Sequence, residues 1–261
     1  MSYEYARRGA SLVIVARREK QLMEVAKKAR ELGSPHVVPV CADVLNAHDC
    51  KRSVDEAIKH FGRLDHLVNN AGIGCVCSFE EVTDITKLAP VMDVNFWGSV
   101  YPTYYAIPHL KKTKGKIFVN ASSSAYIPPP RLSVYAASKA ALVSFYEVLR
   151  VELGPEISIT TATLGFIDSE MTRGKHLSRQ GTFEIDKKSS DDLINGLPRM
   201  SSKDCGKSMV DAICKKHKRV TEPKSYKVFF LLKNVCPELF DWAYHVSYLM
   251  TKSGPSINKV D

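Results

Sequence analysis

The sequence predicts an α/β fold in which helices cover both faces of a doubly wound parallel sheet. Short apolar runs without helical periodicity alternate with amphipathic segments of crossover length, as expected for parallel strands joined by helices. The chain of 261 residues is long enough to bury one full core. Its 44% hydrophobic and 25% charged residues are ordinary for a globular protein.

The first part of the chain contains these elements in strict alternation. Residues 11–16 form an apolar run typical of a strand buried on both faces, and residues 19–32 form an amphipathic helix. A second strand is expected at Val37–Cys41. A helix from about residue 47 to 61 then leads to a third strand at residues 64–68.

The alternation continues beyond this third strand. A helix, a strand, a long helix and a further strand are expected at residues 93–110, 116–120, 134–153 and 157–164. No shift in composition indicates a second domain in this part of the chain. We therefore expect residues 1–175 to form the core of a single domain with a parallel sheet.

Residues 176–261 are expected to form a substrate flap and a C-terminal helical extension of the same domain. Residues 174–200 are polar and rich in loop formers, as in a mobile flap over a pocket, and residues 201–217 predict a helix. The apolar and aromatic stretch at 226–250 has two open interpretations. It rests on a membrane surface beside the basic residues 215–219, or it packs as a helix on the core.

The charge and the cysteines limit the partners of the chain. A formal net charge of +9 suits a polyphosphate cofactor or an anionic membrane surface. No motif interleaves basic and aromatic residues, so we expect no nucleic-acid binding. Cys75-x-Cys77 has no second pair at zinc-site spacing, so we expect reduced thiols and no metal. No apolar run is long enough to span a bilayer.

Tyr135 and Lys139 lie four residues apart at the start of the long helix, so both side chains lie on one face. A phenol has a pKa of about 10, and a nearby cation favours the phenolate, which makes the group useful as an acid or base. Ser122 follows the strand at residues 116–120, at the edge where open α/β sheets bind ligands. Tyr135 and Lys139 alone would indicate a surface pair, but together with Ser122 and the upstream Asn95 they indicate a catalytic site.

Motifs in this order resemble the short-chain dehydrogenase/reductase family. They are Asn69-Asn-Ala-Gly72, the later Asn95, Ser122-x12-Tyr135-x3-Lys139 and the run from Gly165 to Met171. Further runs resemble the plant 11β-hydroxysteroid dehydrogenase-like proteins, the steroleosins: Ala16-Arg-Arg-Glu19, residues 62–72, residues 95–100 and Val220-Thr-Glu-Pro223. The resemblance covers nearly the whole chain. It implies a Rossmann-like fold and an NADP(H)-dependent oxidoreductase that interconverts a secondary alcohol and a ketone on a steroid or similar lipophilic substrate.

The resemblance also implies catalytic roles. Tyr135 would be the proton donor or acceptor at the substrate oxygen, and Lys139 would lower the pKa of Tyr135 and hold the nicotinamide ribose. Ser122 would orient the substrate, and Asn95 would hold a water molecule of a proton relay. The run Ser122-Ser-Ser124 offers more than one serine, and the spacing from Tyr135 selects Ser122.

Arg17 and Arg18 predict a preference for NADP(H) over NAD(H). An acidic residue at this place would bind the adenosine ribose and repel a 2′-phosphate, whereas guanidinium groups pair well with phosphate. A solvated basic loop is the alternative. The resemblance assigns the remaining cofactor contacts to Asp43, Val44, Asn70, Ala71, Gly72, Tyr135, Lys139, Ile167 and Ser169.

The sequence departs from the family pattern in two places. Leu164 stands where the family has a proline before Gly165, which makes the position of the nicotinamide less certain. The family's first strand and Thr-Gly-x3-Gly-x-Gly loop do not precede Leu12. That strand would lie between the strands at Leu12 and Leu67. We therefore expect unpaired strand edges or a collapsed gap, weak cofactor affinity and low stability.

Two functions remain open at this point. The complete catalytic set favours an active hydroxysteroid dehydrogenase-like enzyme. The missing glycine loop favours a truncated, non-catalytic lipid-droplet or membrane-associated protein that keeps the substrate pocket or dimer surface. The resemblance implies the cytosolic face of a lipid droplet or of the endoplasmic reticulum, although a chain without an anchor could be cytosolic. By analogy, the helix at residues 134–153 forms a homodimer interface. The sequence predicts neither the individual substrate nor the direction of the reaction.

Overall fold

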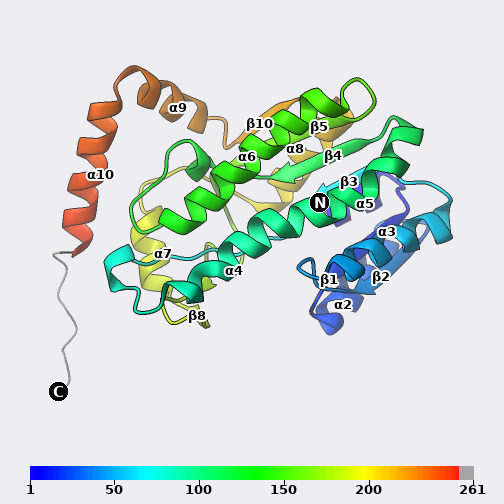
Figure 1. The fold of residues 1–261 in the computed structure, drawn as a ribbon, viewed down its shortest axis with the longest axis horizontal. Coiled ribbons are helices and arrows are strands. Elements are labelled where there is room, and N and C mark those ends of the chain that lie inside the picture. Colours follow the sequence, from blue (N-terminus) through cyan, green and yellow to red (C-terminus); the bar gives the residue numbers. More distant parts are fainter. Residues whose placement is uncertain (253–261) are drawn as a thin grey trace.

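The computed structural model describes residues 1–252 and shows the expected alternation of strands and helices (Figure 1). The main strands are β1 (Leu12–Ala16), β2 (Val37–Cys41), β3 (His66–Asn69), β4 (Lys116–Asn120), β5 (Ser158–Leu164) and β10 (Arg219–Glu222). The longer helices are α2 (Glu19–Glu31), α3 (Ala47–Phe61), α5 (Gly98–Thr113), α6 (Ser133–Leu153), α8 (Ser202–Cys214), α9 (Tyr226–Val235) and α10 (Pro237–Lys252). The short elements are α1 (Ser2–Arg7), α4 (Ala89–Met92), β6 (Phe166–Ile167), β7 (Lys175–Leu177), β8 (Phe183–Ile185), α7 (Lys187–Ile194) and β9 (Arg199–Met200).

The parallel sheet is divided into two parts. Strands β10, β5, β4 and β3 are neighbours in that order, while β1 pairs with β2 alone. In Figure 1 the smaller part, with α2 and α3, lies to one side of the four-stranded part. Within residues 1–252 the outer edges of β1 and β3 have no strand partner. These are the unpaired edges that the sequence predicts.

Helix α1 links the two parts of the sheet. The side chain of Ala6 packs in the cluster formed by β1 and α2, around Ile14 and Leu22. Tyr5, its neighbour in the sequence, packs instead against residues of β3, β4 and α8, and its hydroxyl lies 2.8 Å from Nδ1 of His66 at the start of β3. One short helix therefore contacts both parts.

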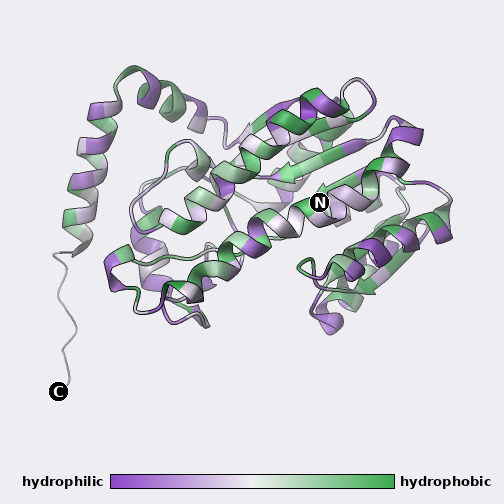
Figure 2. Cartoon of the chain, viewed as in Figure 1, coloured by the Kyte–Doolittle hydropathy of each residue, from purple (hydrophilic) through white to green (hydrophobic). Residues whose placement is uncertain are grey.

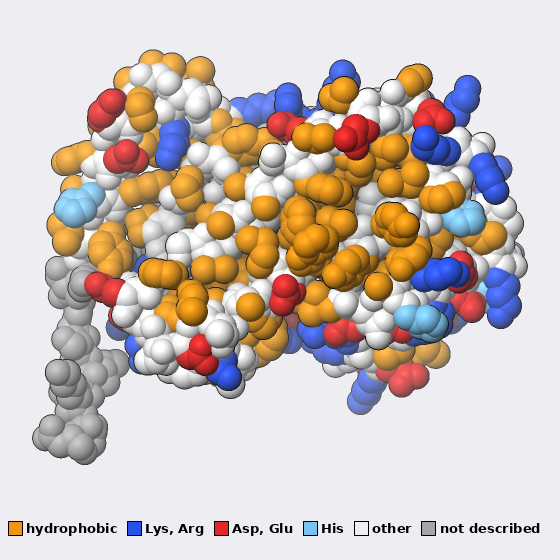
Figure 3. Space-filling model, in the orientation of Figure 1, with side chains coloured by type: hydrophobic (Ala, Val, Ile, Leu, Met, Phe, Trp, Pro, Cys, Tyr) orange, Lys and Arg blue, Asp and Glu red, His pale blue; other side chains and the backbone are white. Residues whose placement is uncertain are grey.

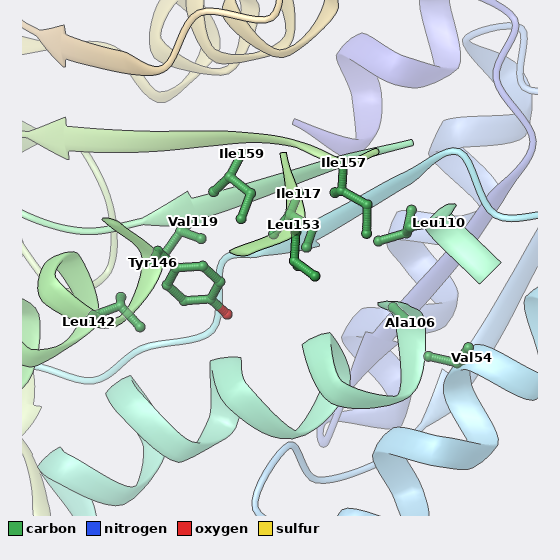
Figure 4. Close-up of a cluster of buried hydrophobic side chains, with 10 residues drawn as sticks. All are labelled: Val54, Ala106, Leu110, Ile117, Val119, Leu142, Tyr146, Leu153, Ile157 and Ile159. Atoms are coloured by element: carbon green, nitrogen blue, oxygen red, sulfur yellow. The ribbon is translucent and has the colours of Figure 1, made fainter. Parts of the chain in front are cut away.

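The central core lies between the four-stranded sheet and helices α5 and α6 (Figure 4). Strand residues such as Ile117 and Ile159 meet Leu142 of α6 and Leu110 of α5, and all four side chains are almost fully buried. Figure 2 shows β4 as a hydrophobic strand between helices of mixed hydropathy. Burial of each such side chain contributes about 1.5–3 kcal/mol, so this layer stabilises the sheet edge that carries the site.

A buried hydrogen-bond network fixes the end of β3. The Tyr146 hydroxyl lies 2.7 Å from Oγ1 of Thr103 and donates to the carbonyl of Ser99 at 2.9 Å. Asn69, the last residue of β3, donates to both hydroxyls, at 2.8 Å to Thr103 and 3.0 Å to Tyr146. The chain therefore leaves β3 from a position tied to both α5 and α6.

Helix α8 covers the opposite face of the sheet. Its Met209 and Ile213 pack against Phe118 of β4 and Ala162 of β5. Because side chains of a strand alternate between faces, Phe118 points away from its neighbour Ile117. Both faces of β4 are thus buried, as expected for a parallel sheet between two helical layers.

The flap and the C-terminal part are more ordered than predicted. Strands β7 and β8 pair antiparallel, β9 pairs with β6, and Arg131 donates to the Ser189 hydroxyl of α7 at 2.9 Å. Tyr244 of α10 donates to the carbonyl of Ile127 at 3.2 Å. The side of α10 that carries Tyr244 therefore contacts the core. Within residues 1–252 no helix is both long and apolar enough to cross a membrane.

Candidate functional site

The C-terminal ends of β3, β4 and β5 bring the predicted catalytic residues to one edge of the sheet. Gly72 follows β3, and Ser122 follows β4 and begins a short 3-10 turn. Tyr135 and Lys139 come from the first turns of α6, and Asn95 from a π-helical turn before α5. Residues far apart in the sequence thus converge where open α/β sheets bind ligands.

Gly72 lies where three of these elements meet. A Cβ atom added to it would lie 3.1 Å from Oδ1 of Asn95 and 3.4 Å from Nζ of Lys139. A side chain here would crowd both groups, so glycine leaves room for the close approach of these elements.

Asn95 fixes the chain segment that follows Gly72. Its Oδ1 accepts a hydrogen bond from the Ile73 N–H at 2.8 Å, and its Nδ2 donates to the Ile73 carbonyl at 3.0 Å and to the Ser138 hydroxyl at 2.9 Å. The side chain is completely buried. π-Helical turns are rare and frequent at functional sites, and this one, Asp93–Trp97, aims the amide at the end of β3. The water-holding role expected for Asn95 stays a prediction.

The hydroxyls of Ser122 and Tyr135 form a hydrogen-bonded pair at this edge. Burial raises the pKa of the Tyr135 phenol above its ordinary value, and a hydrogen bond with Ser122 partly offsets this effect. The Ser122 hydroxyl accepts from the N–H of Ser124 at 3.2 Å and from its hydroxyl at 3.0 Å. Ser122, the serine that the spacing selects, is thus the one beside the phenol.

Lys139 lies almost fully buried beneath the same edge, with 3% of its surface exposed. Its Nζ donates to the Asn120 carbonyl at 2.9 Å and lies 5.8 Å from the centre of the Tyr135 ring. Burial lowers the pKa of Lys139 to about 8. Burial has the larger effect on Tyr135 and raises the pKa of its phenol, and the lowering of this pKa by Lys139 stays a prediction.

Arg17 and Arg18 lie at the C-terminal end of β1, and both side chains are more than half exposed. Arg17 lies 3.7 Å from the carboxylate of Asp43, the residue predicted to face the adenine. Arg18 lies 3.3 Å from Glu170, which follows β6. Val44 packs closely against Gly98. A Cβ atom added to Gly98 would lie 2.8 Å from Cγ2 of Val44.

The remaining predicted contacts are held by local hydrogen bonds. Asn70 accepts from the side chain of Asn120 at 3.0 Å. The N–H of Ser169 donates to the Thr172 hydroxyl at 2.9 Å, and this hydroxyl donates to the Ile167 carbonyl at 2.8 Å. Ala71, between Asn70 and Gly72, is exposed at the same strand end.

The turn after Leu164 has a support that the sequence did not reveal. The Gly165 N–H donates to the Glu222 carbonyl at 2.8 Å, and the Tyr226 ring fills the space where a Cβ on Gly165 would stand. Tyr226 is 2% exposed. These contacts hold the turn that a proline would have stiffened. Tyr226 was predicted only as part of an aromatic stretch, and nothing in its spacing pointed to Gly165.

Ser138, Asn120 and Glu170 are further site residues that sequence reasoning missed. Ser138 binds Asn95 and also donates to the carbonyl of Tyr135 at 2.7 Å. Its position between Tyr135 and Lys139 in the same helical turn was a usable signal. Asn120 acts partly through its backbone carbonyl, and Glu170 through an ion pair across the fold, so neither left a signal in the residue pattern.

The donor set matches only parts of a dinucleotide. The glycine at position 72 gives close access beside Lys139, as a nicotinamide ribose requires, and the exposed guanidinium groups of Arg17 and Arg18 suit an adenosine phosphate. For the pyrophosphate, no glycine-rich turn between a strand and a helix lies between β1 and β3 in the described residues. Within the described residues the arrangement therefore suits the two ends of such a cofactor and offers no glycine-rich turn for its middle.

Comparison with known proteins agrees with this geometry. The family described as short chain dehydrogenase matches residues 1–180. The 11-beta-hydroxysteroid dehydrogenase 1A of Arabidopsis thaliana is 50% identical over 256 residues, which cover 98% of this chain and 73% of that protein. The 11-beta-hydroxysteroid dehydrogenase A of Arachis hypogaea is 47% identical over 256 residues, with the same coverage of 98% and 73%.

Solved structures share the fold. A 3-ketoacyl-(acyl-carrier-protein) reductase from Brucella melitensis complexed with NADH has a TM-score of 0.71 and 25% identity, over 85% of this chain and 89% of that chain. An alcohol dehydrogenase from Thermococcus sibiricus complexed with 5-hydroxy-NADP has a TM-score of 0.61 and 20% identity, over 77% and 88% of the two chains. The second likeness supports the fold alone.

Proposed function

The chain belongs to the short-chain dehydrogenase family of oxidoreductases, and we propose that it interconverts a secondary alcohol and a ketone on a sterol-like lipophilic substrate with NADP(H). The observation that carries the proposal is the convergence of Tyr135, Ser122, Lys139 and Asn95 around Gly72 at one sheet edge. The names of the 11-beta-hydroxysteroid dehydrogenase relatives support the substrate class.

Each residue has a distinct task in this proposal. Tyr135 exchanges a proton with the substrate oxygen at its hydroxyl, and Ser122 orients that oxygen by a hydrogen bond. Lys139 places a positive charge below the phenol while its ammonium is held by the Asn120 carbonyl. Asn95 keeps Gly72 and Ile73 in place beside Lys139. When bound, the nicotinamide supplies or accepts the hydride.

The preference for NADP(H) in the proposal rests on Arg17 and Arg18. Their guanidinium groups are exposed at the end of β1 and can exchange their present partners, Asp43 and Glu170, for a phosphate. Exposed ion pairs are worth about 0–1 kcal/mol, so the exchange costs little. Asp43 and Val44 would then lie along the adenine, and Ile167 and Ser169 beside the nicotinamide.

The experiment is the replacement Tyr135→Phe, assayed with NADPH and a set of ketosteroids. We expect kcat/KM to fall by about 10²–10⁴-fold, since the ring remains and the exchangeable proton is lost. Tyr3→Phe is the matched control, because Tyr3 lies on the surface of α1, away from the site, with 38% of its area exposed. Unchanged turnover by Tyr135→Phe, with the control also unchanged, would refute the assignment of Tyr135.

A membrane-surface role is a second proposal that the C-terminal helices favour. Large apolar side chains of α9 and α10 are exposed: Val228, Leu231, Val235, Leu239, Trp242 and Met250. Such a face can bury itself at a lipid surface, with nearby basic residues contacting anionic headgroups. We expect the chain to float with anionic vesicles and Trp242→Ser with Val235→Ser to reduce flotation several-fold. Equal flotation of the variant and the wild type would contradict this role.

The exposed faces of α5 and α6 support a proposed homodimer. Figure 3 shows hydrophobic side chains gathered across the middle of this face, over the two helices. Tyr104 of α5 and Val148 and Val151 of α6 are 70%, 57% and 81% exposed. An apolar patch of this kind is typical of an interaction site, and a second copy of the chain is the partner that the family analogy favours.

A further inference from the structure

Cys75 and Cys77 form a close thiol pair next to the proposed active site. Their Sγ atoms lie 3.6 Å apart, and the two residues are 3% and 8% exposed. All seven cysteines fall within the described residues, and no other two of them make a sulfur–sulfur hydrogen bond. Cys75 and Cys77 are therefore close enough to react with each other, unlike the other five thiols.

The backbone holds the two thiols toward each other. Cys75 forms a β-bridge with Leu177, and the neighbouring Gly74 carbonyl accepts from the Leu177 N–H at 2.8 Å. The N–H of Cys77 donates to the Arg131 carbonyl at 2.9 Å. Residues two apart in a regular strand have a Cα separation of about 6–7 Å and point to the same face. The hydrogen bonds of this segment to Leu177 and Arg131 keep both thiols on the same face, although the segment lies outside the main sheets.

A small molecule can reach the pair from one side. Cys77 lines a cavity of about 590 Å³ together with Ser78, Arg131 and residues of α10. Tyr244 and Tyr248 of α10 line this cavity, and the Tyr248 hydroxyl lies 3.2 Å from the Ser78 hydroxyl. Cys75 does not line the cavity, so a reagent meets Cys77 first.

The electrostatic surroundings also distinguish the two thiols. The hydrogen bond with Cys75 lowers the pKa of Cys77, and Arg131 and Arg179 act in the same direction, against burial and Glu81. The same hydrogen bond and burial raise the pKa of Cys75. The thiol at the cavity is thus the one that ionises first, and the thiolate is the nucleophile in exchange with disulfides.

We propose that Cys75 and Cys77 form a thiol–disulfide exchange site that reacts with small disulfides such as glutathione disulfide. The Cys77 thiolate attacks one sulfur of the small disulfide, whose S–S bond breaks and releases one small thiolate. Cys75 then loses its proton and attacks Sγ of Cys77, which releases the second small thiolate. Two electrons and two protons pass to the small molecule, leaving two small thiols and one Cys75–Cys77 disulfide.

The new bond requires only a local movement, because the two sulfurs must approach from 3.6 Å to the disulfide length of about 2.05 Å. The affected segment connects Gly72, beside Lys139, with the wall of the cavity. It also packs in the cluster that contacts Tyr135. The site is defined by thiol chemistry, so the proposal does not depend on the oxidoreductase activity.

The test follows the thiols of the purified, reduced chain by mass spectrometry. The chain is equilibrated in glutathione buffers of increasing disulfide content, quenched in acid, alkylated and digested. We expect a product that has lost two hydrogen atoms, with the bond mapped within the peptide that contains Cys75 and Cys77. We also expect iodoacetamide to alkylate Cys77 at pH 7.5 at least about tenfold faster than the buried Cys50.

Variants separate the two steps. Cys75→Ser should stop at a mixed disulfide with one glutathione on Cys77, and Cys77→Ser should leave Cys75 unmodified. Cys50→Ser, which removes a thiol bonded to the Val44 carbonyl, is the matched control and should behave as the wild type. Circular dichroism checks that each variant is folded. A wild-type chain that keeps both thiols reduced while exposed Cys41 becomes glutathionylated would overturn the proposal, as would a folded Cys75→Ser chain without glutathione on Cys77.

Discussion

Burial, more than charge, sets the protonation of the two central residues, Tyr135 and Lys139. Each loses the solvation that favours its charged form, so the pKa of the phenol rises and that of the ammonium falls to about 8. Above about pH 8, therefore, the neutral forms of both side chains are favoured. The motif places the two side chains on one face of α6, but it carries no information on their burial, which comes from the packing of α6 on the sheet. The shared face of the two residues could thus be predicted from sequence, whereas the direction of the pKa shifts could not, and their catalytic roles stay a prediction.

The pH dependence of the two reaction directions follows from these shifts. Ketone reduction needs a protonated Tyr135 and benefits from the positive charge of Lys139, so its kcat/KM should be constant near pH 6–7 and fall as the pH rises through about 8. Alcohol oxidation needs the phenolate and should rise with pH over the same range. Steady-state profiles in both directions measure this. A reduction rate that stays level to pH 9.5 in the wild type would contradict the assignment of Lys139.

Elements with a clear apolar pattern were predicted closely, and elements set by tertiary contacts were not. Strand Val37–Cys41 and helix Ala47–Phe61 have the bounds expected from their apolar patterns. The π turn Asp93–Trp97 was expected to be ordinary helix, because nothing in its residues shows that Asn95 bonds Ile73 across the site. In the flap, strands β7 and β8 were expected as loop, since their pairing depends on contacts of a polar segment. Short elements without an apolar pattern leave no periodic signal.

The close approach of the end of β3 to the π turn leads to a prediction for the variant Gly72→Ala. The added Cβ would lie 3.1 Å from Oδ1 of Asn95 and 3.4 Å from Nζ of Lys139, neither of which can move without breaking its hydrogen bonds. We expect a folded protein whose Kd for NADPH rises about tenfold, equal to about 1.4 kcal/mol. Gly74→Ala is the matched control, because its new Cβ meets the flexible side chain of Met171 at 3.2 Å and should have a smaller effect. Isothermal titration measures both, and an equal effect of the two variants would argue against a cofactor site at Gly72.

At the scale of the molecule, the division of the sheet is the main feature. Helix α1 ties the parts together through Ala6 on one side and Tyr5 on the other, while the edges of β1 and β3 keep unpaired backbone groups. Unpaired edges favour association with other chains, and they lower the stability of the small β1–β2 part. The order of motifs was enough to predict the division, because each motif fixes its own strand in the family topology. The contacts of α1 that bridge it were not foreseen, since they depend on how Tyr5 and Ala6 pack against distant parts of the chain.

The proposal that is most open to a direct test is the binding of NADP(H) at the edge of the sheet. The most direct measurement is a titration of the purified chain with NADPH, followed by nicotinamide fluorescence, with NADH in a parallel titration. We expect saturable binding that is tighter for NADPH than for NADH, because Arg17 and Arg18 pair with the 2′-phosphate. A folded chain that binds neither nucleotide, or binds NADH at least as tightly as NADPH, would contradict the proposal.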